Sequence, residues 1–182
     1  MLFRSIDVSR VRITATTTAK VPNTSATAAS SGADLNGMAA QAAAREIKNR
    51  LAAFAARHFQ VPTASVRFVA NRVEAGENSV SFDELVGLAY KGRVSLSSAG
   101  FYRTPLIHYD RNTASGRPFF YFAYGVAVAE VLVDTLTGEY KVTRADLLHD
   151  VGRSINPAID RGQIEGGFIQ GMGWLTSEEL WW

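Results

Sequence analysis

Few side chains of this sequence have the type and spacing that acid–base, metal or nucleophilic chemistry needs. The three histidines, His58, His108 and His149, stand far apart, and there is no cysteine to join them. Protein metal sites usually draw on ligands at short, regular spacing, so this pattern argues against a metal held by side chains. A chain without cysteine also lacks thiol nucleophiles, disulfides and iron–sulfur ligands. Redox chemistry would therefore have to come from a bound cofactor.

Other catalytic patterns fail on spacing as well. No serine stands in a Gly-x-Ser-x-Gly turn, which argues against a serine hydrolase triad. The glycines from Gly152 to Gly173 match neither the dinucleotide fingerprint nor the P-loop. Asp160 and Glu165 lie among these glycines, where carboxylates are usually solvated or cap a helix, so no paired-acid site is predicted.

Two helix starts rich in glycine, alanine and serine remain as candidate binding positions, at residues 28–34 and 162–167. The first turn of a helix presents unpaired N–H groups and the positive end of the helix dipole. Either start suits a phosphate or the polar edge of a ring. Each glycine at 166, 167, 171 and 173 makes a helix about 1 kcal/mol less stable than alanine would. Glycines at such a cost are expected where another backbone or a ligand approaches the helix closely.

Helices and strands are both expected around these positions, giving an α+β fold. Apolar residues three or four apart predict a helix over 34–59, and Ser81 with Glu84 forms a capping box for a helix over 82–91. Asn156-Pro157 introduces a last helix over 162–180. Strands are expected at 10–18, 66–69, 93–102 and 119–134, a surface loop at 105–118, and a hairpin whose turn needs Gly138.

Composition places the chain among ordinary globular proteins. It has 182 residues, 47% of them hydrophobic and 20% charged, with a net charge of +2. We expect one domain over 1–182, since no repeat or long linker divides the sequence. The small net charge predicts no nucleic-acid partner, and the lack of a long apolar run or export signal predicts no membrane and a cytoplasmic location.

Several sequence segments, in order along almost the whole chain, carry a resemblance to a known family. They are residues 20–30 (KVPNTSATAAS), 34–37 (DLNG), 94–97 (VSLS), 100–102 (GFY), 122–127 (FAYGVA), 134–138, 150–152 (DVG), 156–160 (NPAID), 162–166 (GQIEG) and 170–171. The chain resembles the molybdopterin-binding large subunit of the xanthine dehydrogenases, which are molybdenum hydroxylases. The resemblance weakens only over about 60–80.

The resemblance implies part of a molybdopterin-binding domain with mixed sheets and long packed helices, and site residues within it. The backbone of Ala28 and Ala29 would run beside the molybdenum, with Ala29 nearest the metal. Ser30 and the position of Gly32 would contact the pterin, although many relatives carry a hydroxyl where this chain has Gly32. Gln163 matches a glutamine that reaches the pterin ring, and an amide offers it both a donor and an acceptor.

The resemblance also implies a larger enzyme that oxidises hypoxanthine to xanthine and xanthine to urate. Its general-base glutamate, in a Gly-Glu-Pro context, and its substrate-orienting residues match nothing in these 182 residues. The chain is therefore expected to be an internal fragment with no catalytic residue and no activity alone. Its partners would be the purine, the rest of the subunit and an iron–sulfur/FAD part, with NAD bound elsewhere. A hydroxylase of aldehydes or other N-heterocycles, or a non-catalytic remnant or module, remains an alternative.

Overall fold

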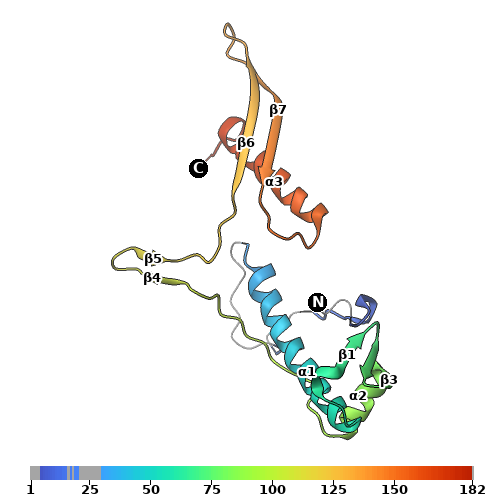
Figure 1. Cartoon of the computed structure of the whole chain (residues 1–182). Helices are drawn as coiled ribbons and strands as arrows, with labels where there is room; N and C mark the ends of the chain where they lie inside the picture. The colour runs from blue at the N-terminus through green and yellow to red at the C-terminus, as the bar shows by residue number, and fades with distance from the viewer. Residues whose placement is uncertain (1–4, 16, 18, 21–29, 182) are drawn as a thin grey trace. The chain divides into compact units, whose positions relative to one another are not determined.

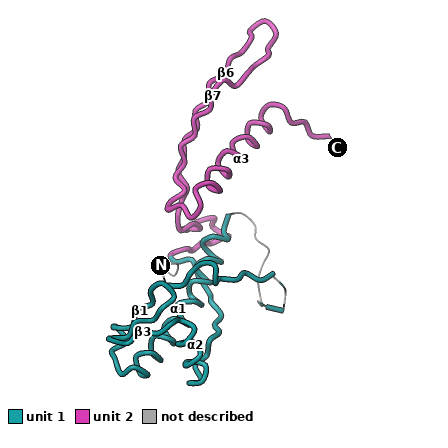
Figure 2. Tube along the Cα trace, turned by 90° about the vertical axis from the view of Figure 1, so that its right-hand side faces the viewer, with its two compact units in different colours: residues 1–105 teal, residues 106–182 magenta. Residues whose placement is uncertain are grey.

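The computed structural model describes residues 5–15, 17, 19–20 and 30–181. The chain divides into two compact units, Met1–Pro105 (unit 1) and Leu106–Trp182 (unit 2), which are coloured separately in Figure 2. This division by contacts does not test whether residues 1–182 form one domain, so that expectation stays a prediction. Each unit is described by itself below.

The described part of unit 1 contains two α-helices and a three-stranded sheet, with short 3-10 and π-helical segments beside them. Its elements are α1 (Gly37–His58), β1 (Val66–Val69), β2 (Arg72–Ala75), β3 (Asn78–Ser81) and α2 (Phe82–Lys91). The strands form an antiparallel meander in the order β1-β2-β3 beside the C-terminal end of α1 (Figure 1). The core consists of buried side chains from α1, β2 and α2, namely Leu51, Ala55, Val73, Leu85 and Ala89.

The helices of unit 1 confirm two predictions. α2 begins directly after Ser81, whose Oγ accepts a hydrogen bond from the Glu84 amide at 3.1 Å. That bond satisfies one of the unpaired donors of the first turn. The predicted helix over 34–59 is α1, preceded by a short π-helix, Gly32–Asn36.

The strand predicted over 10–18 is wrong for the described part of that range. A 3-10 helix, Val8–Arg10, is followed by irregular backbone at 11–15, and Ile13 is 97% exposed. Alternating apolar residues can form one face of a strand, but the backbone still needs a neighbouring strand for its hydrogen bonds. No described strand pairs with these residues. Residues 5–7, just before this range, are instead held by Asn71. The backbone N–H of Asn71 donates to the Ser5 carbonyl at 2.9 Å, and its side-chain Oδ1 accepts from the Asp7 backbone N–H at 2.7 Å.

Unit 2 consists of two hairpins and a helix. Its elements are β4 (His108–Asp110), β5 (Ser115–Arg117), β6 (Gly125–Val133), β7 (Tyr140–His149) and α3 (Pro157–Thr176). The pairs β4–β5 and β6–β7 are antiparallel. The surface-loop prediction for 105–118 is therefore wrong in part, because two short strands pair within it. The strand expected from 119 begins only at Gly125.

The hairpin β6–β7 and the last helix largely follow expectation. Gly138 has a φ of +80°, as the predicted turn requires, since that backbone conformation suits glycine. α3 starts at Pro157 rather than at 162, because Asn156 Oδ1 caps the Ile159 amide and proline suits the first helical position. The helix ends at Thr176 rather than near 180.

Asp134 makes the β6–β7 turn sensitive to acid. Its Oδ1 accepts hydrogen bonds from the Leu136 and Thr137 amides at 2.8 and 3.3 Å. These hydrogen bonds lower the pKa of the Asp134 carboxyl below its ordinary value, and the bond from the Leu136 amide has the larger effect. The carboxylate therefore stabilises the turn above the unfolded pKa, about 3.9, and this contribution disappears as pH falls through the lower folded value.

We expect the Leu136 and Thr137 amide resonances to shift with pH in this acid range in the wild-type chain. Asp134→Ala should abolish that titration, which NMR can follow residue by residue. The same titration persisting in the alanine variant would show that another group controls the turn.

The described residues thus form a mixed helix and sheet structure, which confirms the α+β prediction. No helix in the described ranges is both long and apolar enough to cross a membrane.

Candidate functional site

The start of α1 is one of the two helix starts that sequence analysis singled out. Ala28 and Ala29 lie outside the described residues, and Ser30 is exposed. Ser31 precedes the π-helix Gly32–Asn36, and its side chain caps no amide of that helix. Among the described residues, no side chain before this helix caps the amides of Gly32, Ala33 and Asp34, and such donors at a helix start can bind a ligand.

Few described atoms lie near Gly32. A Cβ built there would meet only Asn36 Nδ2, at 3.9 Å, among the described atoms. Asp34 adds a negative charge to this first turn, and its Oδ1 accepts from the Leu35 amide at 2.8 Å. The amides of residues 32–34 and the Ser30 hydroxyl are hydrogen-bond donors, which the carbonyl and ring nitrogens of a pterin can accept. The residues present therefore fit the expected cofactor.

Gln163 lies in unit 2, in the second turn of α3, and is exposed. Cβ atoms built at the neighbouring Gly162, Gly166 and Gly167 would meet no described atom within 4 Å. The side-chain amide of Gln163 therefore lies on an exposed helix surface, and no described residue packs on the glycines next to it. Of the four glycines where a close approach was predicted, only Gly173 has one from a described residue, because a Cβ there would lie 2.8 Å from Glu178 Oε1; Gly166, Gly167 and Gly171 have none within 4 Å.

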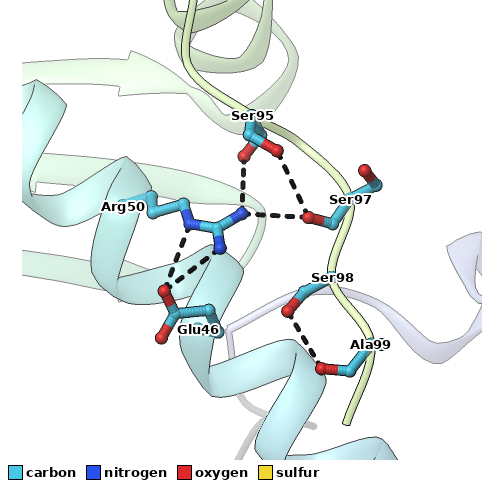
Figure 3. A network of polar contacts seen from close by, with 6 residues as sticks. All are labelled: Glu46, Arg50, Ser95, Ser97, Ser98 and Ala99. Carbon is cyan, nitrogen blue, oxygen red and sulfur yellow. Dashed lines mark hydrogen bonds and ion pairs between the residues drawn. The ribbon is translucent and has the colours of Figure 1, made fainter.

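Residues 94–100 bind to the side of α1, in the segment where we predicted a strand over 93–102. No strand is assigned there, so that prediction is wrong, although burial still alternates from Val94 to Ser98. The carbonyls of this segment find a side chain rather than a neighbouring strand. Arg50 Nη1 donates to the Ser97 carbonyl at 2.9 Å and to that of Ser95 at 3.4 Å (Figure 3).

A wide-open surface cavity of about 420 Å³, lined by exposed residues, lies at the end of the β6–β7 hairpin, where the sequence predicted no site. Its lining comes from both strands and the residues next to them: Tyr124, Gly125, Val126, Leu148, His149 and Asp150. The Asp150 amide donates to the Tyr124 carbonyl at 2.8 Å. Among the described residues, no group of three or more His, Asp or Glu side chains could hold a metal ion. No local motif could have revealed the cavity, because the β6–β7 pairing creates it.

The chain belongs to the molybdopterin cofactor-binding domain family, whose model matches residues 2–182. This match confirms the family resemblance and the fold that it implied.

Individual relatives agree with this assignment. The chain is 47% identical over 175 residues to xanthine dehydrogenase/oxidase of Mus musculus and 45% identical over 178 residues to xanthine dehydrogenase of Oryza sativa subsp. japonica. These matches cover 96% and 98% of the chain but only 12% of each relative. A solved structure of a Cu,Mo-CO dehydrogenase matches with a TM-score of 0.62 and 25% identity, over 82% of this chain and 18% of that one.

Proposed function

We propose that this chain supplies part of the cofactor cradle of a molybdenum hydroxylase that oxidises hypoxanthine to xanthine and xanthine to urate. The observation that carries the proposal is 45–47% identity, across nearly the whole chain, to proteins named xanthine dehydrogenase. The chain spans 12% of those relatives, so catalysis would need residues beyond these 182. An aldehyde- or N-heterocycle-oxidising enzyme is the alternative, and the likeness to a CO dehydrogenase shows how widely the fold is used.

Within this cradle, each predicted site residue has a role in binding. The backbone of Ala28 and Ala29 would pass beside the molybdenum, with Ala29 adjacent to it. Ser30 and the amide of Gly32 would hydrogen-bond the pterin, and Gln163 would offer its side-chain amide to the ring. When bound, molybdenum-molybdopterin supplies two-electron oxidation of the substrate carbon, while these residues hold and orient the cofactor.

The same proposal defines the partners and the location. A purine would be the substrate, and the remaining parts of the molybdopterin subunit and an iron–sulfur/FAD part would complete the enzyme. The iron–sulfur clusters, FAD and NAD would all bind outside this chain. We infer a cytoplasmic enzyme with no nucleic-acid or membrane partner.

Capture of the native polypeptide from source cells tests this function. The β4–β5 turn is exposed, so an antibody against residues 111–116 should reach it. We expect a captured species much larger than 19.8 kDa that contains molybdopterin and oxidises xanthine with an artificial electron acceptor. Oxidation of aldehydes but not of xanthine would favour the alternative substrate class. A captured species without any pterin would contradict the proposed function.

Gln163→Ala in that enzyme should weaken retention of the pterin about two- to tenfold. The variant would lose one hydrogen bond to the pterin, and an ordinary hydrogen bond contributes about 0.5–1.5 kcal/mol, which equals this factor in binding. Pterin content after gel filtration measures the effect. Gln170→Ala is the matched control, because Gln170 is also an exposed glutamine of α3. Equal retention by both variants would remove Gln163 from the site.

A further inference from the structure

The fully buried residues of α1 all lie toward its C-terminal end. They are Leu51, Ala55 and Ala56. Toward the start of the helix, Met38 is exposed and Ala39 and Ala43 are only partly buried. The described residues of α1 before Ile47 add no side chain to the core cluster, so this part of the helix needs another contact if it is to keep one position.

Residues 94–100 make that contact. Gly100 lies so close to α1 that a Cβ built on it would be 1.9 Å from the Ala39 carbonyl oxygen and 2.9 Å from the Ala43 nitrogen. The small side chains of Ala39 and Ala43 permit this approach. At the other end of the segment, Val94 and Leu96 pack against the core cluster. The segment therefore connects the core to the N-terminal half of α1.

Arg50 is the polar connection between this segment and the helix. Its guanidinium donates to the carbonyls of Ser95 and Ser97 and also binds Glu46 Oε1 through two nitrogens, both at 3.2 Å (Figure 3). Its side chain is 34% exposed, so water only partly competes for these bonds. The planar fork suits this task, because it can reach a carboxylate and two carbonyls at once.

We propose that Arg50 is a positioning residue, which holds residues 94–100 on α1 and thereby keeps the start of that helix in place for the cofactor. The effect reaches the site through the chain: Gly100 contacts Ala39, and the continuous helix begins at Gly32, beside Ser30. This inference rests on the proposed function for the roles of Ser30 and Gly32. The mechanical part, in which Arg50 holds residues 94–100 and Gly100 in turn contacts Ala39, does not depend on a cofactor.

Two measurements on the full 182-residue chain test the mechanical part. Because the sequence has no cysteine, Ala99→Cys gives a single spin-label position on the segment. In Arg50→Met we expect this label to become mobile, and amides of residues 37–44 to exchange about three- to tenfold faster with deuterium. Residues 51–58 should exchange as in the wild type, which a general loss of structure would not allow. Arg50→Lys should restore part of the effect, since lysine keeps the charge but not the fork.

Arg45→Met is the matched control, because Arg45 lies on the same helix and its guanidinium contacts Gln41 at 3.4 Å. An Arg50→Met chain that behaves like this control would overturn the proposal. So would faster exchange spread evenly over residues 37–58, since that result indicates a merely structural arginine.

A third measurement connects the residue to the cofactor. In the captured native enzyme, Arg50→Met should lower the pterin content relative to wild type and to Arg45→Met. Unchanged pterin content together with a loosened helix start would overturn the link to the cofactor. Absence of pterin from the wild type itself would contradict the proposed function, while label mobility and exchange would still decide the role of Arg50.

Discussion

Replacing Leu85 with alanine is expected to lower the free energy of unfolding of unit 1 by about 2–5 kcal/mol. Leu85 has no exposed surface and lies at the centre of the core, with Val73 of β2 and Ala55 of α1 in the same cluster. Few other large side chains are fully buried there, so little can move in to fill the space that the leucine leaves. A loss of this size is comparable with the total stability of many small domains.

Urea denaturation with hydrogen exchange of the α1 and α2 peptides measures this effect. The three tryptophans, Trp174, Trp181 and Trp182, all belong to unit 2, so their fluorescence follows the other unit in the same sample. Leu136→Ala makes the same chemical change at a side chain that is 94% exposed, and it should alter stability by less than about 0.5 kcal/mol. Similar losses in the two variants would show that the α1–β2–α2 cluster is not the stabilising core.

Replacing Gly100 with alanine is expected to cost about 1–3 kcal/mol and to separate residues 97–100 from α1. The added methyl group would lie 1.9 Å from the Ala39 carbonyl oxygen, and this oxygen belongs to the backbone of a helix. Neither it nor the Ala43 nitrogen can withdraw without breaking helical hydrogen bonds. The segment must therefore move, and the N-terminal half of α1 loses its neighbour.

Hydrogen exchange over residues 37–44 reports this separation, and thermal unfolding gives the stability change. Gly87→Ala provides the control, because a Cβ at Gly87 in α2 would meet no described atom within 4 Å. That substitution should stabilise the helix by up to about 1 kcal/mol, through helix propensity alone. If Gly100→Ala were as stable as Gly87→Ala, the close packing of the segment on α1 would be refuted.

Elements whose signals are local could be predicted well. The capping box of Ser81 and Glu84 placed α2 at its observed start, and Gly138 marked the β6–β7 turn. In both cases a few neighbouring residues satisfy the backbone by themselves. The family motifs belong to the same group, because they can be recognised in the order of residues alone.

The predicted strands at 10–18 and 93–102 failed for a common reason. Alternating apolar and polar residues indicate which side chains share a face of a strand. A strand also needs a neighbouring strand for its backbone hydrogen bonds, and the local sequence does not reveal whether one is present. At 94–100 the partner proved to be the side chain of Arg50, more than forty positions away along the chain. The short β4–β5 strands were missed for the opposite reason, because their pairing overrides a turn-rich composition.

By itself, the sequence determined the family and the mixed helix and sheet class. It also named the candidate residues Ala28, Ala29, Ser30, Gly32 and Gln163, whose binding roles stay predictions. Those conclusions rest on residue identity and short-range order, which need no knowledge of distant contacts. Tertiary structure alone decided that Arg50 and Gly100 make contacts between α1 and residues 94–100 from the two sides of this junction, and that an open cavity lies at the paired ends of β6 and β7. Both features depend on groups far apart in the chain meeting at atomic distances, which only packing can specify.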